Sequence, residues 1–370
     1  MKKLGLLILA LCLQTFAFAE NPYQISLLTC SPGDEIYSVF GHTAIRVKSD
    51  QENVDLVFNF GLFDFGTSHF ALKFAKGTLM YCLGIQRMDH FVMEYTYDNR
   101  LVVEQVLDLS DDQKDMICSK LDHLYLPENR YYQYAFIERN CATEVRDILR
   151  EAGLEFDVQP IKFTDRDLIE LYLPNHKWLR FGINMALGRT IDKPSNTYRA
   201  MFLPDFLHDG IKELDEKKGG VIVKENVLNS VTRAESKADW WYSPLFVFSL
   251  LLILALLIKH KSFPVTLFAI IGLVGLVVLT LCLFSQHIEV KQNFNLLWCN
   301  PLYFVYLPFI IKNKIPKWLP IFFLSLLGLT VIFWITGLQH FDVAIIPMLL
   351  TLSWVNLRLI PRKEKEKIKH

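Results

Sequence analysis

The sequence has no excess of charge of either sign. Its 370 residues contain 39 Lys and Arg against 39 Asp and Glu, which excludes a chain-wide basic surface for nucleic acid. Its seven cysteines include no CxxC or zinc-binding spacing, and no internal repeat or low-complexity segment occurs, so nothing predicts a metal site or a repeat fold. Because 52% of the residues are apolar, the composition also excludes an intrinsically disordered chain.

The apolar and charged residues are separated along the chain. Charged residues concentrate between positions 20 and 240, and the apolar surplus lies at 244–360. This division predicts a polar globular domain followed by a membrane region.

The N-terminus is typical of a secretory signal peptide over residues 1–19. Lys2 and Lys3 precede the apolar run 4–13, and a small-x-small cleavage pattern follows at 17–19. An uncleaved anchor helix is the alternative, but the apolar run is short for a membrane span. We therefore expect the domain that follows to be exported.

The C-terminal half contains five apolar stretches, each close to the roughly 20 residues that cross a bilayer. They are 244–258, 264–284, 296–311, 318–338 and 343–359. The connections at 259–261 and 312–317 and the tail 361–370 are basic, whereas 285–295 and 339–342 contain little Lys or Arg. The positive-inside rule then predicts a cytoplasmic C-terminus and a periplasmic N-terminal domain in the bacterial inner membrane.

The mature N-terminal part predicts an α+β fold. Short apolar or alternating runs predict strands at 25–29, 43–48, 55–60, 78–85 and 101–107. Helices are expected at 111–124, after a capping box that begins at Ser110, and at about 140–152, ending at Gly153. We divide the chain into a catalytic domain at 20–160, a mixed helical extension at 161–242 and a transmembrane domain at 243–360.

Two short strings suggest chemistry. His42 follows Gly41 at the start of a predicted strand, and Cys141 lies in the first turn of a predicted helix, where the macrodipole favours a thiolate. A thiolate beside a histidine is an acyl-transfer nucleophile with its base, and the N–H groups of the helix start can hold an oxyanion. The alternative is a structural histidine and a small buried cysteine. The spacing assigns no role to Tyr81, His69, His90 or Arg100.

A resemblance to a known family rests on the motifs Phe40–Val47, Phe58–Gly61 and Arg139–Thr143, together with Asn293–Leu302 in the membrane half. On these motifs, the sequence resembles the Lnb family of Bacteroidetes envelope proteins. More broadly it is similar to the circularly permuted papain-like group, in which histidine precedes cysteine, as in lecithin:retinol acyltransferase-like and NlpC-type enzymes. The resemblance implies a permuted papain-like periplasmic domain joined to a transmembrane bundle of about five helices.

The resemblance also implies site residues. Cys141 is the expected nucleophile, His42 the base and Asn59 the orienting group, although Asn59 could instead close a turn before Gly61. Arg139 and Asn140 are candidates for substrate binding, and pairing with a nearby acid is the favoured alternative for Arg139. Four polar residues of the membrane half are candidates for a headgroup site, or alternatively for hydrogen bonds between helices: Asn293, Asn295, Trp298 and Asn300.

The function implied by the resemblance is lipoprotein N-acylation. An acyl chain would move from a membrane phospholipid through a thioester enzyme to the α-amine of a diacylglyceryl-cysteine lipoprotein. We expect no metal and no organic cofactor, because the phospholipid supplies the activated acyl group. Two alternatives stay open, an envelope cysteine peptidase or peptidoglycan amidase, and a non-enzymatic binding or signalling module.

Overall fold

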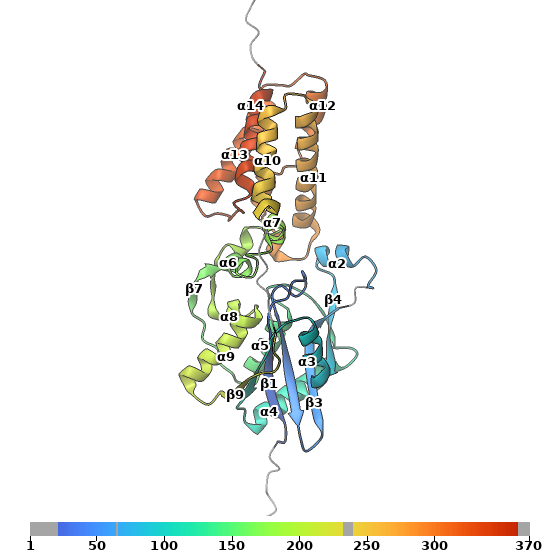
Figure 1. Cartoon of the computed structure of the whole chain (residues 1–370), viewed down its shortest axis with the longest axis vertical. Helices are drawn as coiled ribbons and strands as arrows, with labels where there is room; N and C mark the ends of the chain where they lie inside the picture. Colours follow the sequence, from blue (N-terminus) through green and yellow to red (C-terminus); the bar gives the residue numbers. More distant parts are fainter. Residues whose placement is uncertain (1–20, 64–65, 232–239, 362–370) are drawn as a thin grey trace, which may run out of the picture.

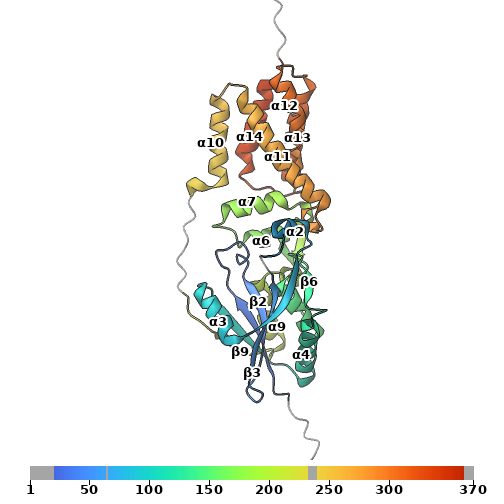
Figure 2. The same cartoon turned by 90° about the vertical axis from the view of Figure 1, so that its right-hand side faces the viewer.

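The computed structural model describes residues 21–63, 66–231 and 240–361. The predicted signal peptide and residues 362–370 of the predicted basic tail lie outside these ranges. The described chain forms two stacked parts, a sheet-containing domain built from the N-terminal half and a group of helices built from the C-terminal half (Figure 1). Helix α7 lies across the junction between them (Figure 2).

A single antiparallel sheet forms the centre of the N-terminal domain. Its seven strands run in the order β6-β4-β3-β2-β1-β5-β9. They are β1 (Gln24–Cys30), β2 (His42–Ser49), β3 (Val54–Leu62), β4 (Met80–Arg87), β5 (Val102–Leu107), β6 (Tyr131–Gln133) and β9 (Ile222–Val227). Strands β1 to β5 are the five that the apolar alternation predicts, within about two residues at each end, because alternation directly reports a half-buried strand.

Helices cover both faces of this sheet. One face packs its apolar residues against α4, α5 and α9, and the other packs against α3. The helices of this domain are α2 (Phe70–Lys76), α3 (Met88–Tyr97), α4 (Asp111–Tyr125), α5 (Cys141–Glu151), α6 (Asp165–Glu170), α7 (Lys177–Ala186), α8 (Thr197–Ala200) and α9 (Pro204–Lys218). The capping box predicted at Ser110 is confirmed, since its side chain and that of Gln113 bond reciprocally.

The structure differs from the predicted boundary at residue 160. Strand β9 pairs with β5 at the edge of the main sheet, and α9 packs into the same core as α4 and α5. A small second sheet of β7 (Pro160–Thr164) and β8 (Pro194–Asn196) also crosses the boundary. Residues 161–228 therefore complete the N-terminal domain, because a strand that lies far away in the sequence closes an otherwise exposed sheet edge.

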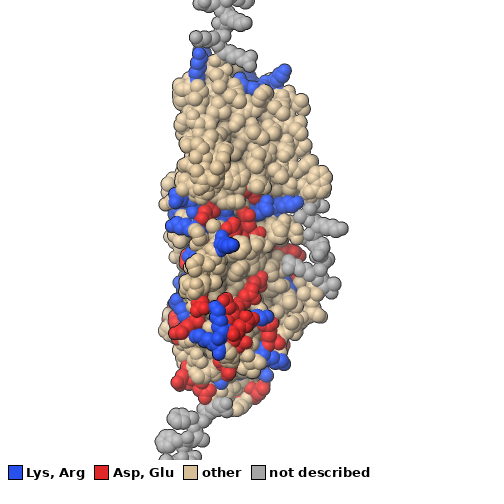
Figure 3. Space-filling model, turned by 90° about the vertical axis from the view of Figure 1, so that its left-hand side faces the viewer, with Lys and Arg blue, Asp and Glu red and all other residues tan. Residues whose placement is uncertain are grey.

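The C-terminal half consists of apolar helices. They are α10 (Pro244–Leu257), α11 (Ser262–Phe284), α12 (Tyr303–Ile311), α13 (Trp318–Ile335) and α14 (Ile345–Leu359). By length and composition, α11 and α13 are the two of the described helices that can cross a membrane. On the face shown in Figure 3, the helical part forms a band without charged side chains, with Lys and Arg at its free end and both signs at the junction.

The third apolar helix is shorter than the predicted span 296–311. The chain makes a 3₁₀ turn at Phe294–Leu297, and regular α-helix begins only at Tyr303. The irregular segment lies directly against α11, where a Cβ on Gly275 would come within 2.1 Å of the Cys299 carbonyl oxygen. Glycine permits this close approach, so the segment packs on α11 instead of adding turns to α12.

Candidate active site

Cys141 is the first residue of α5, and the residue before it caps the helix. Asn140 Oδ1 accepts the Thr143 N–H at 3.0 Å, and Thr143 Oγ1 accepts the Asn140 N–H at 2.7 Å, which is the reciprocal pattern of a capping box. The Asn140 amide nitrogen also donates to the carbonyls of Phe136 and Phe202. These bonds occupy the Asn140 side chain, so it holds the Cys141 thiol in place at the helix start.

His42 and Asn59 meet across two neighbouring strands. Ile45 of β2 lies opposite Phe58 of β3. Because side chains alternate along a strand, His42 and Asn59 both project from the face opposite to that pair. His42 Nε2 and Asn59 Oδ1 are 2.5 Å apart. Asn59 is buried within β3 and does not close a turn.

The Cys141 thiol lies at the ends of these same strands. The thiol is within hydrogen-bonding range of the N–H groups of Thr43, Ala142 and Cys141 itself, and the residue as a whole is partly exposed. Gly61 allows β3 to approach α5 closely, since a Cβ on this residue would lie 3.7 Å from Cys141 Cβ. Because Thr43 follows His42 directly, the thiol lies at the start of the strand that carries the imidazole. Within the described residues, no direct hydrogen bond joins them, which is common in the absence of substrate.

Burial decides the charge state of the thiol. The helix dipole predicts a lowered pKa, but the structure reverses this prediction. Removal of the Cys141 thiol from water raises its pKa, and this effect outweighs the lowering by the three N–H groups and by Arg100. Cys141 therefore rests as a neutral thiol, and a base would have to remove its proton for it to act as a nucleophile.

His42 has the properties of such a base. Burial lowers the pKa of the imidazole to about 4, against the raising effect of Asn59 and with a further lowering by Arg100. The ring is therefore neutral at physiological pH. Since Asn59 Oδ1 accepts a hydrogen bond, Nε2 carries the proton and Nδ1 keeps its lone pair. This tautomer can accept a proton at Nδ1.

A buried arginine completes the surroundings of the histidine. Arg100 is 6% exposed, and its Nε donates to the Ser31 carbonyl at 2.9 Å. Its guanidinium lies 4.6 Å from the centre of the Tyr95 ring, and Tyr95 stacks on His42 at 6.3 Å with an interplanar angle of 16°. In the described part of the chain, Arg100 Nη2 has no hydrogen-bond partner and no carboxylate pairs with the side chain. A permanent cation thus lies near the reactive pair.

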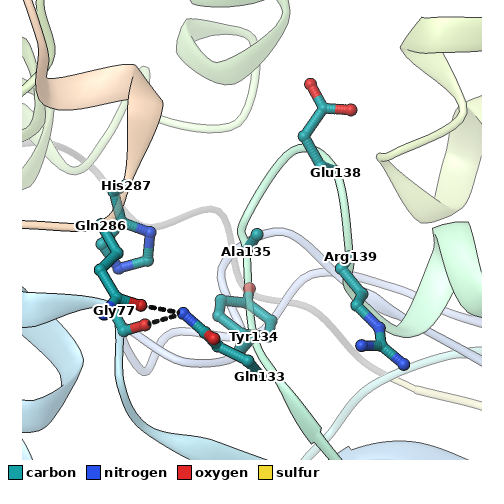
Figure 4. Close-up of a pocket in the computed structure, with 8 residues that line it drawn as sticks. All are labelled: Gly77, Gln133, Tyr134, Ala135, Glu138, Arg139, Gln286 and His287. Atoms are coloured by element: carbon teal, nitrogen blue, oxygen red, sulfur yellow. Dashed lines mark hydrogen bonds between the residues drawn. The ribbon is translucent and has the colours of Figure 1, made fainter.

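A pocket of about 390 Å³ lies beside this site, between the N-terminal domain and the loop after α11. Gln133 bonds to the Gly77 carbonyl and to Gln286 on one side, while Glu138 and Arg139 line the other (Figure 4). Arg139 is two residues before Cys141 in the sequence, whereas Cys141, His42 and Asn59 are not among the residues that line the pocket. Eight residues line it: Gly77, Gln133, Tyr134, Ala135, Glu138, Arg139, Gln286 and His287.

The Arg139 side chain has an acidic partner, as the favoured alternative predicts. Its Nε donates to Glu144 Oε1 at 2.8 Å, and its guanidinium lies over the Tyr132 ring. This bond leaves the paired terminal nitrogens of Arg139 facing elsewhere, so its substrate-binding role stays a prediction.

Polar residues predicted in the membrane half take part in the contact between the two halves of the molecule. Asn293 and Asn295 are buried, and their amide nitrogens donate to carbonyls at the end of α7, those of Asn184, Met185 and Ala186. Trp298 donates to Asn295 Oδ1, and Asn300 donates to the Leu296 carbonyl. The bonds of Asn293 and Asn295 attach the membrane half to α7, whereas those of Trp298 and Asn300 stay within the segment 295–300. A headgroup site at these residues stays a prediction.

Comparison with known families agrees with this two-part organisation. Residues 17–172 match the Lnb N-terminal periplasmic domain, and residues 235–365 match the Lnb transmembrane domain. The chain belongs to the Lnb-like family. Family membership indicates a membrane protein of the cell envelope with a periplasmic N-terminal region, and suggests an enzyme that modifies lipoproteins. No curated protein and no solved structure gives a significant match.

The Lnb-like site contains residues that sequence analysis did not assign. Arg100 lies 58 positions after His42 in the sequence, and Tyr95 lies on α3, a helix that the sequence did not predict. No local pattern connects them with the histidine, because only the packing of α3 on the sheet brings them together. Arg100 acts on both groups, since its charge lowers the pKa of His42 and of Cys141.

Proposed function

We propose that the chain is a thiol-dependent lipoprotein N-acyltransferase with Cys141 as nucleophile, His42 as base and Asn59 as the residue that orients the base. The observation that supports this best is the ordering of His42 by Asn59 beside a capped helix that begins at Cys141. A strand-borne histidine that precedes a helix-opening cysteine agrees with a permuted papain-like domain.

The first half-reaction takes an acyl chain from a phospholipid. Cys141 Sγ attacks the ester carbonyl carbon while His42 Nδ1 accepts the thiol proton, and the new C–S bond leaves a negative oxygen. The Cys141 and Ala142 N–H groups of the first helical turn are candidates to hold this oxygen. The ester C–O bond then breaks, and His42 returns its proton to the departing oxygen. A lysophospholipid leaves, and the acyl chain remains as a thioester.

The second half-reaction gives this chain to the lipoprotein. The free α-amine of a diacylglyceryl-cysteine attacks the thioester carbonyl, and His42 Nδ1 accepts the amine proton as the C–N bond forms. The C–S bond breaks, and the proton returns to Cys141 Sγ, so the product is an amide and the enzyme is restored. The chemistry requires no metal or organic cofactor, because the ester and thioester supply the acyl group.

The attachment of the domain to the membrane helices supports lipid-anchored substrates. Asn293 and Asn295 hold the end of α7 against these helices, and Arg180 forms an ion pair with Asp342 at 3.1 Å. The pocket beside Cys141 also includes residues of the loop after α11. A hydrolase of soluble wall fragments would need neither contact. We also propose an inner-membrane location with a cytoplasmic C-terminus, since the basic connections lie at the end away from the domain (Figure 3).

The test is the intact mass of the purified full chain after incubation with phospholipid vesicles. The proposal expects a mass gain of one acyl chain that hydroxylamine removes, in the wild type and in Cys282→Ala but not in Cys141→Ala. Addition of a diacylglyceryl-cysteine peptide should discharge the adduct and yield N-acylated peptide. Transfer that persists in Cys141→Ala contradicts the mechanism. Cleavage of wall peptides by the wild type, without an acyl adduct, would instead support the peptidase or amidase alternative.

A further inference from the structure

The short helix α2 is attached to the end of a membrane helix. Its last three carbonyls have no hydrogen-bond donor within the helix. The loop directly after α11 supplies donors to all three. The Phe74 carbonyl bonds to His287 Nε2 at 3.0 Å, that of Ala75 to Ser285 Oγ at 2.7 Å, and that of Lys76 to the Gln286 N–H at 2.8 Å. These donors lie within three residues of Phe284, where α11 ends. Both ribbon views place α2 beside this end (Figures 1 and 2).

One side of α2 presents an apolar side chain, Leu72, which is 68% exposed. Phe70, about 160° away around the helix, packs on Phe63 at a ring distance of 5.6 Å. Phe74 lies on the same side as Phe70 and beside the His287 ring. At the adjoining end of α11, Leu283 is 62% exposed. The apolar surface of a membrane helix thus continues onto a helix of the periplasmic domain. An apolar surface of this kind marks contact with a partner, and the partner of α11 is lipid.

The charges of α2 suit a membrane surface. Lys73 and Lys76 lie in its last turn, and neither forms an ion pair with an acidic residue of the described chain. Lysines beside an apolar face can extend to phosphate groups while the apolar side chains enter the acyl region. No Asp or Glu lies on α2, so nothing on the helix opposes contact with anionic lipid.

We propose that α2 lies in the plane of the membrane surface and inserts Leu72 into the periplasmic leaflet beside α11. The occupant of this surface is phospholipid, because the surface is continuous with the lipid-facing end of a membrane helix. A helix in this position buries its apolar face about 5–10 Å into the headgroup and acyl boundary. The contact does not depend on the identity of the reaction at Cys141.

One consequence rests on the proposed function. Gly77 ends α2 and also lines the pocket that contains Arg139, two residues before the nucleophile. A phospholipid held by α2 would therefore have its headgroup at the mouth of this pocket. Helix α2 is then the element that presents the acyl donor to Cys141.

Photocrosslinking with matched positions tests the contact. Benzoylphenylalanine replaces one residue at a time in the full chain, reconstituted in vesicles of phosphatidylethanolamine and phosphatidylglycerol. Met93 on α3 is the control, because it is 66% exposed and apolar but lies on a helix that does not contact the membrane helices, and Leu283 on α11 defines full labelling. The comparison is made in a reconstituted preparation in which Leu283→benzoylphenylalanine forms a phospholipid adduct, so that labelling by lipid is known to work.

The proposal expects Leu72→benzoylphenylalanine to form the adduct at a level near that of position 283 and several-fold above that of position 93. Labelling at 72 that equals labelling at 93 overturns it, as does an adduct with a second copy of the chain in place of lipid. Lys76→benzoylphenylalanine, at an exposed position one helical turn after Leu72 on the same side of α2, provides the same comparison if position 72 disturbs folding.

A second measurement addresses the presentation of the donor. Leu72→Glu should slow acyl-enzyme formation from vesicle phospholipid several-fold, whereas Met93→Glu should not. Alkylation of Cys141 by iodoacetamide should stay unchanged in both variants, because the thiol is not altered. A normal acyl-transfer rate in Leu72→Glu overturns the proposal that α2 presents the acyl donor, and it leaves the proposed membrane contact of α2 unaffected. The absence of any acyl adduct in the wild type overturns the proposed function and leaves the crosslinking result valid.

Discussion

The chain contains two strings in which asparagine accompanies cysteine, and the structure uses them differently. In the N-terminal domain, Asn140 caps a helix so that the Cys141 thiol is partly exposed beside three N–H groups and His42. In the membrane half, Asn295 accepts the bond of a fully buried thiol, Cys299, at 3.1 Å. Residue Cys141 is partly exposed, whereas Cys299 is completely buried. Reactivity therefore depends on what surrounds the thiol, and the sequence neighbours alone do not decide it.

The difference extends to the polar groups around each string. Near Cys141, Arg100 is buried without an acidic partner, and the lone pair of His42 Nδ1 faces no described hydrogen-bond donor. Near Cys299, the amides of Asn293 and Asn295 are occupied by carbonyls of α7. Unsatisfied groups are costly in a folded protein and concentrate where a ligand will pair with them. The unpaired Arg100 nitrogen makes the first region a candidate for ligand contact, whereas the bonds of Asn293 and Asn295 in the second region hold the two halves together.

The largest expected effect is the loss of the base. His42→Ala should lower the rate of acyl-enzyme formation by roughly 10²–10⁴-fold, the usual contribution of a positioned general base, while vesicle binding stays intact. His90→Ala, at an exposed histidine of α3, should leave the rate unchanged. The measurement is the initial rate of the hydroxylamine-sensitive mass gain. A normal rate in His42→Ala would remove the histidine from the mechanism.

The pH dependence tests the charge state of the same histidine. Burial lowers the pKa of His42 to about 4, and a base must be neutral to accept a proton. The rate of acyl-enzyme formation should therefore not fall on the acid side until the pH approaches 4, measured between pH 4 and 8. An acid limb near 6.5, the value of an exposed histidine, would contradict the buried environment.

Removal of the Arg100 charge should have a moderate effect on the reactivity of Cys141. The positive charge of Arg100 lowers the pKa of the Cys141 thiol, so Arg100→Gln should raise that pKa and slow iodoacetamide alkylation at pH 7 several-fold. Arg100→Lys keeps the charge and should recover most of the rate. Equal alkylation rates in the wild type and Arg100→Gln would show that the charge does not act on the thiol.

Substitution of Asn295 in the membrane half should have a smaller effect on catalysis and should lower the stability of the protein. Asn295→Ala leaves buried carbonyls of α7 without their donor and should cost about 1–3 kcal/mol of unfolding free energy. Thermal unfolding in detergent measures this loss, and Asn300→Ala, which removes a bond only to the nearby Leu296 carbonyl, should cost less. The acyl-enzyme rate of folded Asn295→Ala should stay within a few-fold of the wild type. A loss comparable to that of His42→Ala would assign Asn295 to substrate binding.

The smallest effect is expected from an ion pair at the surface of the pocket. Arg139 and Glu144 are partly exposed, and such pairs contribute about 0.2–1 kcal/mol. Arg139→Gln and Glu144→Gln should therefore lower the melting temperature slightly and by similar amounts. If Arg139 binds the donor phosphate, only Arg139→Gln will also raise the KM for phospholipid.

Much of the site follows from local patterns. The first-turn position of Cys141 and the strand that begins at His42 were predicted within a residue or two, because helix and strand periodicity act over a few positions. The capping role of Asn140 was not predicted, since this residue was considered only as a candidate for substrate binding. Helices α2 and α3 were not predicted, since each is short and depends on packing against the sheet or the membrane helices. Strand β9 was missed for the same reason: its partner β5 lies more than 110 residues away.

The sequence by itself determined the division into a polar and an apolar half, the main strands and the helix that opens at Cys141, whereas the export signal stays a prediction. These features rest on composition, periodicity and local hydrogen bonds. Only the tertiary structure decided that Asn59 meets His42, that burial raises the pKa of the thiol against the helix dipole, and that Asn293 and Asn295 hold α7. Strand register, desolvation and domain contacts depend on residues that are distant in the sequence, and no local pattern contains that information.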